Sequence, residues 1–222
     1  MSCTQTVCDT DLPRARPHSL RGILGEPAWE RLPPAVRQRF ADPARSVDYA
    51  GEFAIVRASR VGRILAWACQ LIGTPIVPRT GRNVPAIVRV GPCEKGVNWT
   101  REYCWPDRST CVVRSTKVIG PDGVLVEELP AGLCMELAVH EEAGTLHFVS
   151  LRYYFRLQLL GRLGFLDAGH VKLTLPHWLS PGTTHVEHVD HDDGSFQFTM
   201  TVTHQVLGEI YFQTGRFRAR GE

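Results

Sequence analysis

Short runs of β-branched and aromatic residues follow one another from Asn83 almost to the end of the chain, with turn signals between them. The breaks include Pro121-Asp122-Gly123 and Asp193-Gly194, which favour tight reversals. No long helical segment separates the runs, so antiparallel pairing of neighbouring strands is predicted. We expect strands at 47–58, 84–90, 97–105, 109–119, 123–128, 132–140, 145–156, 170–175, 185–192, 195–203 and 207–217.

Helical spacing of apolar residues is confined to the first third of the chain. The segments SLRGILG from Ser19 and PAWERLPPAVRQRF from Pro27 predict two short helices, because Pro33 and Pro34 fit the start of a helix. The segment RVGRILAWACQLIG from Arg60 predicts a further helix. Its expected apolar stripe consists of Val61, Ile64, Leu65, Ala68 and Leu71.

So many strands rarely stay flat, and curling removes the exposed edges of a sheet. We therefore expect a mainly β fold: a curved antiparallel meander that closes into a barrel or half-barrel, lipocalin-like in outline, with short N-terminal helices. Its interior would have room for a ligand. Residues 1–18 are expected to form a flexible leader, and residues 19–217 a single barrel-like domain.

Charge and composition disfavour several classes of partner. The chain has 25 Lys and Arg against 23 Asp and Glu, a net charge of +2, which does not favour nucleic-acid binding. It has no apolar run of about 18 residues, and no secretion signal. The seven cysteines are scattered without a CxxC pair, so no disulfide framework is expected. We expect a cytoplasmic protein with no membrane span, and the sequence permits a homodimer.

The segment WTREYCW places one arginine among three large aromatic residues on one face of a strand. That face consists of Trp99, Arg101, Tyr103 and Trp105. If it lines the interior, the aromatic rings would hold a planar or polyene ligand and the guanidinium would stabilise negative charge. The alternative is an outer face whose aromatic residues cover the N-terminal helices.

The segment HVEHVDHDDGSFQFTMTVTH predicts a hairpin whose second strand turns its phenylalanines inward. A two-residue loop at Asp193-Gly194 would point His185 and Glu187 into the core. A three-residue loop ending in a glycine bulge would point His188 and Asp190 inward instead. Either register places an ionisable group on an apolar face. That group is a candidate general acid or base, or a structural partner of an arginine.

The strand at 145–156 supplies further candidates, whereas the histidines and the known motifs do not indicate a metal or cofactor. In the strand at 145–156, alternation places Tyr153 on the face of His147, and Phe148 on the opposite face with Tyr154. The histidines His185, His188 and His191 alternate faces, so a metal site is not predicted. The sequence also lacks the GxGxxG, GxxxxGK[ST], GxSxG and HExxH motifs, and no cofactor is expected.

Landmarks along residues 20–217 resemble an uncharacterised bacterial domain family. Its members occur alone or fused behind short-chain-dehydrogenase-like or saccharopine-dehydrogenase-like domains. The resemblance implies one intact domain and no particular chemistry. A proline that the family tends to place before the final Leu-Gly pair is absent here, where His204 and Gln205 stand. The matching landmarks are Trp29, LPPAVR at 32–37, Trp99-Thr100-Arg101, VLVEEL at 124–129, Pro176-His177-Trp178-Leu179, Glu187, Asp193-Gly194, Phe196, Phe198 and LGEIYFQTG at 207–215.

These observations favour a cofactor-independent enzyme that acts on a hydrophobic small molecule, such as a natural-product intermediate, inside the barrel. The reaction would be an isomerisation, a cyclisation or an elimination. The alternatives are a carrier of a hydrophobic ligand without catalysis, and an accessory module that docks on a dehydrogenase-like partner. The catalytic candidates are Arg101, Glu187, His188 and Tyr153. The substrate-binding candidates are Trp99, Tyr103, Trp105, Phe148 and Tyr154.

Overall fold

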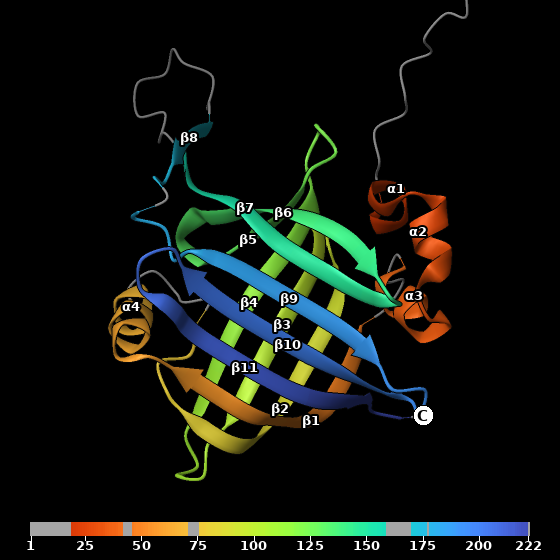
Figure 1. Ribbon diagram of the computed structural model, residues 1–222, viewed down its shortest axis with the longest axis horizontal. Helices are drawn as coiled ribbons and strands as arrows, with labels where there is room; N and C mark the ends of the chain where they lie inside the picture. Colours follow the sequence, from red (N-terminus) through yellow and green to blue (C-terminus); the bar gives the residue numbers. More distant parts are fainter. Residues whose placement is uncertain (1–18, 42–45, 71–75, 159–169, 177, 222) are drawn as a thin grey trace, which may run out of the picture.

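The strands form one antiparallel sheet that closes on itself (Figure 1). The computed structural model describes residues 19–41, 46–70, 76–158, 170–176 and 178–221. The strand order is β6-β5-β4-β3-β2-β1-β11-β10-β9-β7, and a further pairing of β6 with β7 completes the ring. The strand β8 pairs with β7 beside the ring. The mainly β barrel expected from the sequence is thus confirmed.

The strand bounds agree with the sequence expectation to within a few residues. The strands are β1 (Val47–Ala58), β2 (Gly81–Cys93), β3 (Gly96–Cys104), β4 (Thr110–Ile119), β5 (Leu125–Glu128), β6 (Leu133–Glu142), β7 (Thr145–Gln158), β8 (His170–Thr174), β9 (Thr183–Asp190), β10 (Ser195–His204) and β11 (Gly208–Ala219). The expected leader at 1–18 lies outside the described residues.

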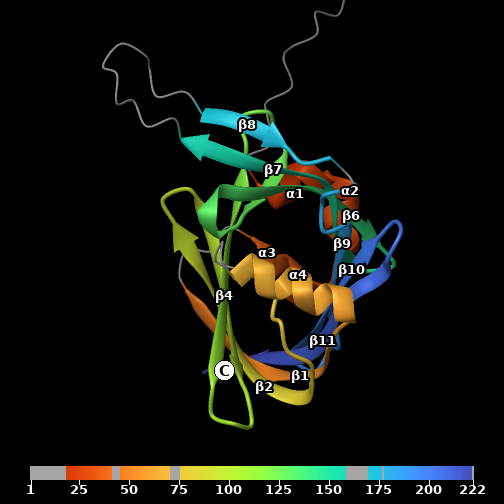
Figure 2. The same cartoon turned by 90° about the vertical axis from the view of Figure 1, so that its left-hand side faces the viewer.

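Short helices cover both ends of the barrel. The helix α4 (Arg60–Gln70) lies across one end, and α1 (Leu20–Leu24), α2 (Glu26–Arg31) and α3 (Pro34–Phe40) lie on the opposite side (Figures 1 and 2). Two N-terminal helices were expected before α4, and there are three. Pro33 forces Leu32 into an extended conformation and so divides α2 from α3. None of the helices described is long and apolar enough to cross a membrane.

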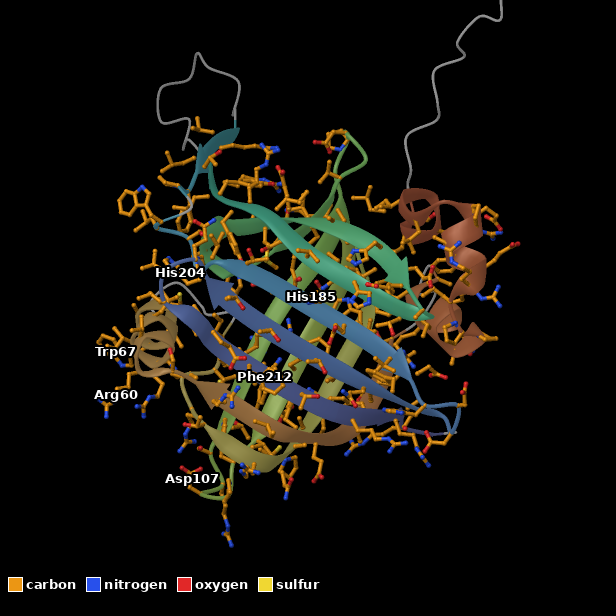
Figure 3. All side chains as sticks on the ribbon, viewed as in Figure 1. Arg60, Trp67, Asp107, His185, His204 and Phe212 are labelled. Atoms are coloured by element: carbon orange, nitrogen blue, oxygen red, sulfur yellow. The ribbon has the colours of Figure 1, made fainter. Side chains whose placement is uncertain are left out.

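The stripe expected on α4 is wrong. Gly62, Ala66 and Cys69 are its buried residues, whereas Ile64 and Trp67 are largely exposed. Figure 3 shows Trp67 on the outer side of this helix. A Cβ atom at Gly62 would lie only 1.9 Å from the carbonyl oxygen of Ile210. The helix therefore approaches the backbone of β11 so closely that its small residues make the contact. Leu71 lies outside the described residues.

A bulge in β7 changes which of its side chains face the interior. Glu136 pairs with Arg152 and Leu137 pairs with Ser150, so Leu151 has no partner in β6 and is exposed. The extra residue interrupts the period of two. Phe148 and Tyr153 therefore both face inward, while Tyr154 packs on the outside against Val126 and Cys134. The expectation that Phe148 and Tyr154 share a face is wrong for this reason.

The hairpin of β9 and β10 has the second of the two predicted registers. Phe198 pairs with His188, Phe196 pairs with Asp190, and the loop ends at Gly194, whose φ is +77°. His188 consequently faces the interior and is 2% exposed. Glu187, which faced inward in the other register, lies on the outer face.

Inside the barrel, a buried glutamine joins two tyrosines near the end that α4 covers. The Gln213 side chain is fully buried, and its Oε1 accepts hydrogen bonds from the Tyr103 hydroxyl at 2.9 Å and the Tyr211 hydroxyl at 2.8 Å. Tyr103 also stacks on Phe53, with ring centroids 4.8 Å apart. This part of the interior is closely packed core.

We predict that Gln213→Leu lowers the free energy of unfolding by about 2 kcal/mol, because the buried tyrosine hydroxyls lose their shared acceptor. Urea denaturation followed by circular dichroism measures the change. The control is Gln197→Leu on β10, whose side chain is only partly buried and bonds Thr199. Equal stability of the two variants would contradict the role assigned to the glutamine.

Candidate functional site

The barrel interior contains a small cavity whose lining includes Cys69 of α4. Its volume is about 50 Å³, enough for a few water molecules. Most of its lining is apolar, and the strongly polar side chains in it are Arg101, Lys117, Glu127 and His188. An apolar cavity with a few convergent polar groups is the usual composition of a small-molecule site.

Three of these ionisable groups form a charged cluster on neighbouring strands β3, β4 and β5. The Lys117 Nζ lies 3.0 Å from Glu127 Oε2, and the Arg101 Nη2 lies 3.5 Å from Glu127 Oε1. The same Arg101 nitrogen donates to Ser115 Oγ at 3.0 Å. Two cations therefore share one carboxylate, which leaves one positive charge in excess within the cluster.

Burial and the neighbouring charges act in opposite directions on this cluster. Burial by itself would raise the pKa of Glu127, but the charges of Lys117 and Arg101 hold that pKa at about 2. Burial also lowers the pKa of Lys117, and the charge of Arg101 adds to this effect. Glu127 is ionised at neutral pH, so the excess positive charge stays available to an anionic group.

His188 lies beside the cluster in a cage of aromatic rings. Its ring centroid is 4.8 Å from that of Phe40, 5.3 Å from Phe198 and 5.9 Å from both Trp99 and Phe148. Burial lowers the pKa of His188 well below its ordinary value, and the charges of Arg39, Lys117 and Arg101 lower it further. The imidazole is therefore neutral. Its Nδ1 is buried and has no hydrogen-bond partner among the described residues.

A second, outer cavity of about 210 Å³ lies where the N-terminal helices meet the barrel, and its lining includes Leu20 of α1 and Phe40 of α3. Trp99, Lys117 and Phe148 line both cavities. Phe40, the last residue of α3, stacks on Trp99 with centroids 5.7 Å apart and also touches Phe148 and His188. The end of α3 thus closes the interior on this side, and the ammonium group of Lys117 lies at the boundary between the two cavities.

The predicted inward face of β3 is divided between the cavity and the core. Trp99 and Arg101 line the cavity, whereas Tyr103 and Trp105 are stacked in the core next to Phe53. All four side chains are buried, as the interior interpretation required.

The other residues predicted from the sequence are divided between the cavity and the outer face of the barrel. Phe148 and Tyr153 line the cavity, and the Tyr153 hydroxyl lies 2.7 Å from Thr184 Oγ1. Tyr154 and Glu187 lie on the outer face and do not reach it. The structure therefore brings together Trp99, Arg101, Phe148, Tyr153 and His188.

Sequence reasoning missed Lys117 and Glu127. Both lie in strands with apolar residues on each face, VVRSTKVI and VLVEEL, so hydrophobic alternation does not indicate which face is buried. The signal that would have found them is cross-strand pairing. Lys117 lies directly opposite Glu127, and the reversal at Pro121-Asp122-Gly123 sets that register.

We predict that Glu127→Gln destabilises the protein by about 3–5 kcal/mol at neutral pH, because two buried cations lose their counter-charge. The folded pKa of Glu127 lies below its ordinary value of about 4.5. Its stabilising effect is therefore complete above that pH, and it is lost as the pH falls towards about 2.

Urea denaturation at pH values from 7 to 2.5 provides the measurement. The difference in stability between the wild type and Glu127→Gln should narrow below about pH 4.5. A difference that stays constant over this range would contradict an ionised Glu127 in the folded protein. Glu52→Gln, on β1 and away from the cluster, is the matched control.

A comparison with protein-family models gives one match. The model described as a domain of unknown function, DUF4166, matches residues 32–217. No curated protein and no solved structure matches the chain. The match covers most of the chain and all eleven strands except the last residues of β11, so the chain belongs to the DUF4166 family.

Proposed function

We propose that the barrel binds a hydrophobic small molecule carrying an anionic or carbonyl oxygen, and that it catalyses a proton-transfer reaction on this molecule without a cofactor. The observation that supports this is the excess positive charge of Arg101 and Lys117 next to an unpaired, neutral His188 in an apolar cavity. A core that served only for stability would gain from apolar residues at these positions.

The geometry suits a shift of a proton along the substrate. A carbonyl oxygen next to Arg101 and Lys117 would accept the negative charge as His188 removes a proton from the neighbouring carbon. The imidazolium would then return that proton to a different carbon. The net reaction is an isomerisation, and loss of a leaving group or ring closure would be variants of the same first step.

The lowered pKa of His188 is compatible with this role. Burial lowers the pKa of the His188 imidazole, and the positive charges of Arg39, Lys117 and Arg101 lower it further. An anionic or partly anionic ligand would offset those charges and raise the pKa of the imidazole again. The base therefore gains strength when the substrate is present.

A ligand of ordinary size needs more room than the inner cavity provides. Small-molecule sites are usually several hundred Å³ in volume, against about 50 Å³ here. Displacement of Phe40 from its contacts with Trp99 and His188 would join the inner cavity to the outer one of about 210 Å³. We infer that the ligand enters from the side of α3.

We predict that the barrel binds fluorescent fatty acids and that Lys117→Met weakens this binding at least tenfold. Binding of the matching uncharged alcohol should change little, because the ammonium group attracts only the carboxylate. Fluorescence titration measures both affinities. Arg114→Met is the control, since Arg114 lies on the same strand and points to solvent. Equal loss for acid and alcohol would contradict an anion-binding role for Lys117.

Catalysis is tested separately from binding. Extracts of the native host in deuterated water should contain a hydrophobic compound that exchanges a carbon-bound proton when the protein is added. His188→Asn should retain binding and lose this exchange. Binding without exchange in the wild type would favour the carrier function. Absence of binding would contradict both the enzyme and the carrier function. The accessory-module function would then be tested by binding to a dehydrogenase-like partner.

A further inference from the structure

A second group of ionisable side chains lies on the outer face of the barrel, where β7 and β9 pair. His147 of β7 lies directly opposite Glu187 of β9, and His185 precedes Glu187 by two residues on the same face. Figure 3 labels His185 on this side of the barrel. Leu146, Phe148 and His188 point into the interior from the same two strands, so the outer group does not share the cavity described above.

The three side chains converge on one point. The His147 Nδ1 lies 3.0 Å from His185 Nε2 and 3.8 Å from Glu187 Oε1. One ligand atom from each residue lies within 4.8 Å of the other two. A tetrahedral zinc ion bonded at about 2.0–2.1 Å requires its ligand atoms to be about 3.3 Å apart. The two distances from His147 lie on either side of that value.

The packing of the group also suits a metal site. His147 is 7% exposed, and its ring stacks on those of His140 and His185. His147 Nδ1 and His185 Nε2 are within hydrogen-bond distance, so a hydrogen carried by one of the two rings lies between them. A bound ion would take the position of that hydrogen after small rotations of the rings.

We propose that His147, His185 and Glu187 form a binding site for a divalent transition-metal ion, with zinc as the best match to two imidazoles and one carboxylate. Three protein ligands leave a fourth position for water or for a further side chain. His140 is the nearest candidate, since its ring stacks on His147 with centroids 4.8 Å apart.

A competing set shares one member with this site. His140, Glu142 and His147 also lie within 4.8 Å of one another, but His140 and Glu142 are exposed and both come from β6. The set with His185 and Glu187 is more buried, and the pairing of β7 with β9 holds its members in place. We therefore assign His147, His185 and Glu187 as the ligands, and His140 to a supporting position.

The test is a titration of the full chain with Zn²⁺ after removal of metals with EDTA, followed by isothermal calorimetry. We expect one ion per chain with a dissociation constant in the micromolar range or below. His185→Gln and Glu187→Gln should each weaken binding at least tenfold. The control is His204→Asn, which replaces a histidine that bonds the backbone of Val206 and Leu207 by a residue able to accept the same bonds.

Cobalt provides an independent readout of the ligands. Co²⁺ bound to the wild type should show the intense visible absorption of a four-coordinate ion, which His185→Gln should abolish while circular dichroism shows an unchanged fold. Absence of stoichiometric Zn²⁺ binding would overturn the proposal. Zn²⁺ binding that survives both His185→Gln and Glu187→Gln would also overturn it. The same holds for binding that is lost in His140→Ala but kept in His185→Gln. Lys117→Met should bind Zn²⁺ normally, so this test is separate from that of the interior site.

Discussion

The pairing of β7 along both of its edges gives the barrel its closed interior. Along one edge β7 pairs with β6, and along the other its first half pairs with β9 and its second half with β8. The bulge at Leu151 lies between the two halves and turns both Phe148 and Tyr153 inward. Without this double pairing, the sheet would have two free edges and the polar groups inside would be accessible to water.

Closure imposes a strict condition on those polar groups. A charged side chain that has lost its water must find a partner, and the interior cluster as a whole meets this condition only in part. Arg101 and Lys117 together neutralise Glu127, but this single carboxylate cannot neutralise both cations. His188 remains neutral and keeps an unpaired nitrogen. These incompletely paired groups support our proposal that a bound molecule completes them.

The sequence predicted the elements of the fold well because their signals are local. Turn residues such as Pro121-Asp122-Gly123 mark the ends of strands, and alternating apolar residues mark their length. The number of strands predicted a barrel or half-barrel, and the pairing of β6 with β7 shows that the barrel is closed. The boundary between α2 and α3 was missed, although Pro33 indicates it. The contact face of α4 could not be predicted, because it depends on how closely Gly62 approaches Ile210.

The site was predicted less completely because it depends on pairings between strands. Trp99, Arg101 and Phe148 were found, since an arginine or a phenylalanine in an alternating aromatic strand is conspicuous. The choice between Glu187 and His188 depended on one residue in a hairpin loop. Leu151 adds a bulge that no periodicity shows, and it moved Tyr154 to the outside. Lys117 and Glu127 become a pair only through the register of β4 and β5.

The most direct measurement for the interior site is native mass spectrometry of the protein purified from its own host. We expect a fraction of the molecules to carry one hydrophobic compound with an acidic or carbonyl group, and we expect Lys117→Met purified in the same way to lack it. Wild-type protein that is uniformly free of small molecules, and that stays free after incubation with a host extract, would contradict a ligand-binding interior.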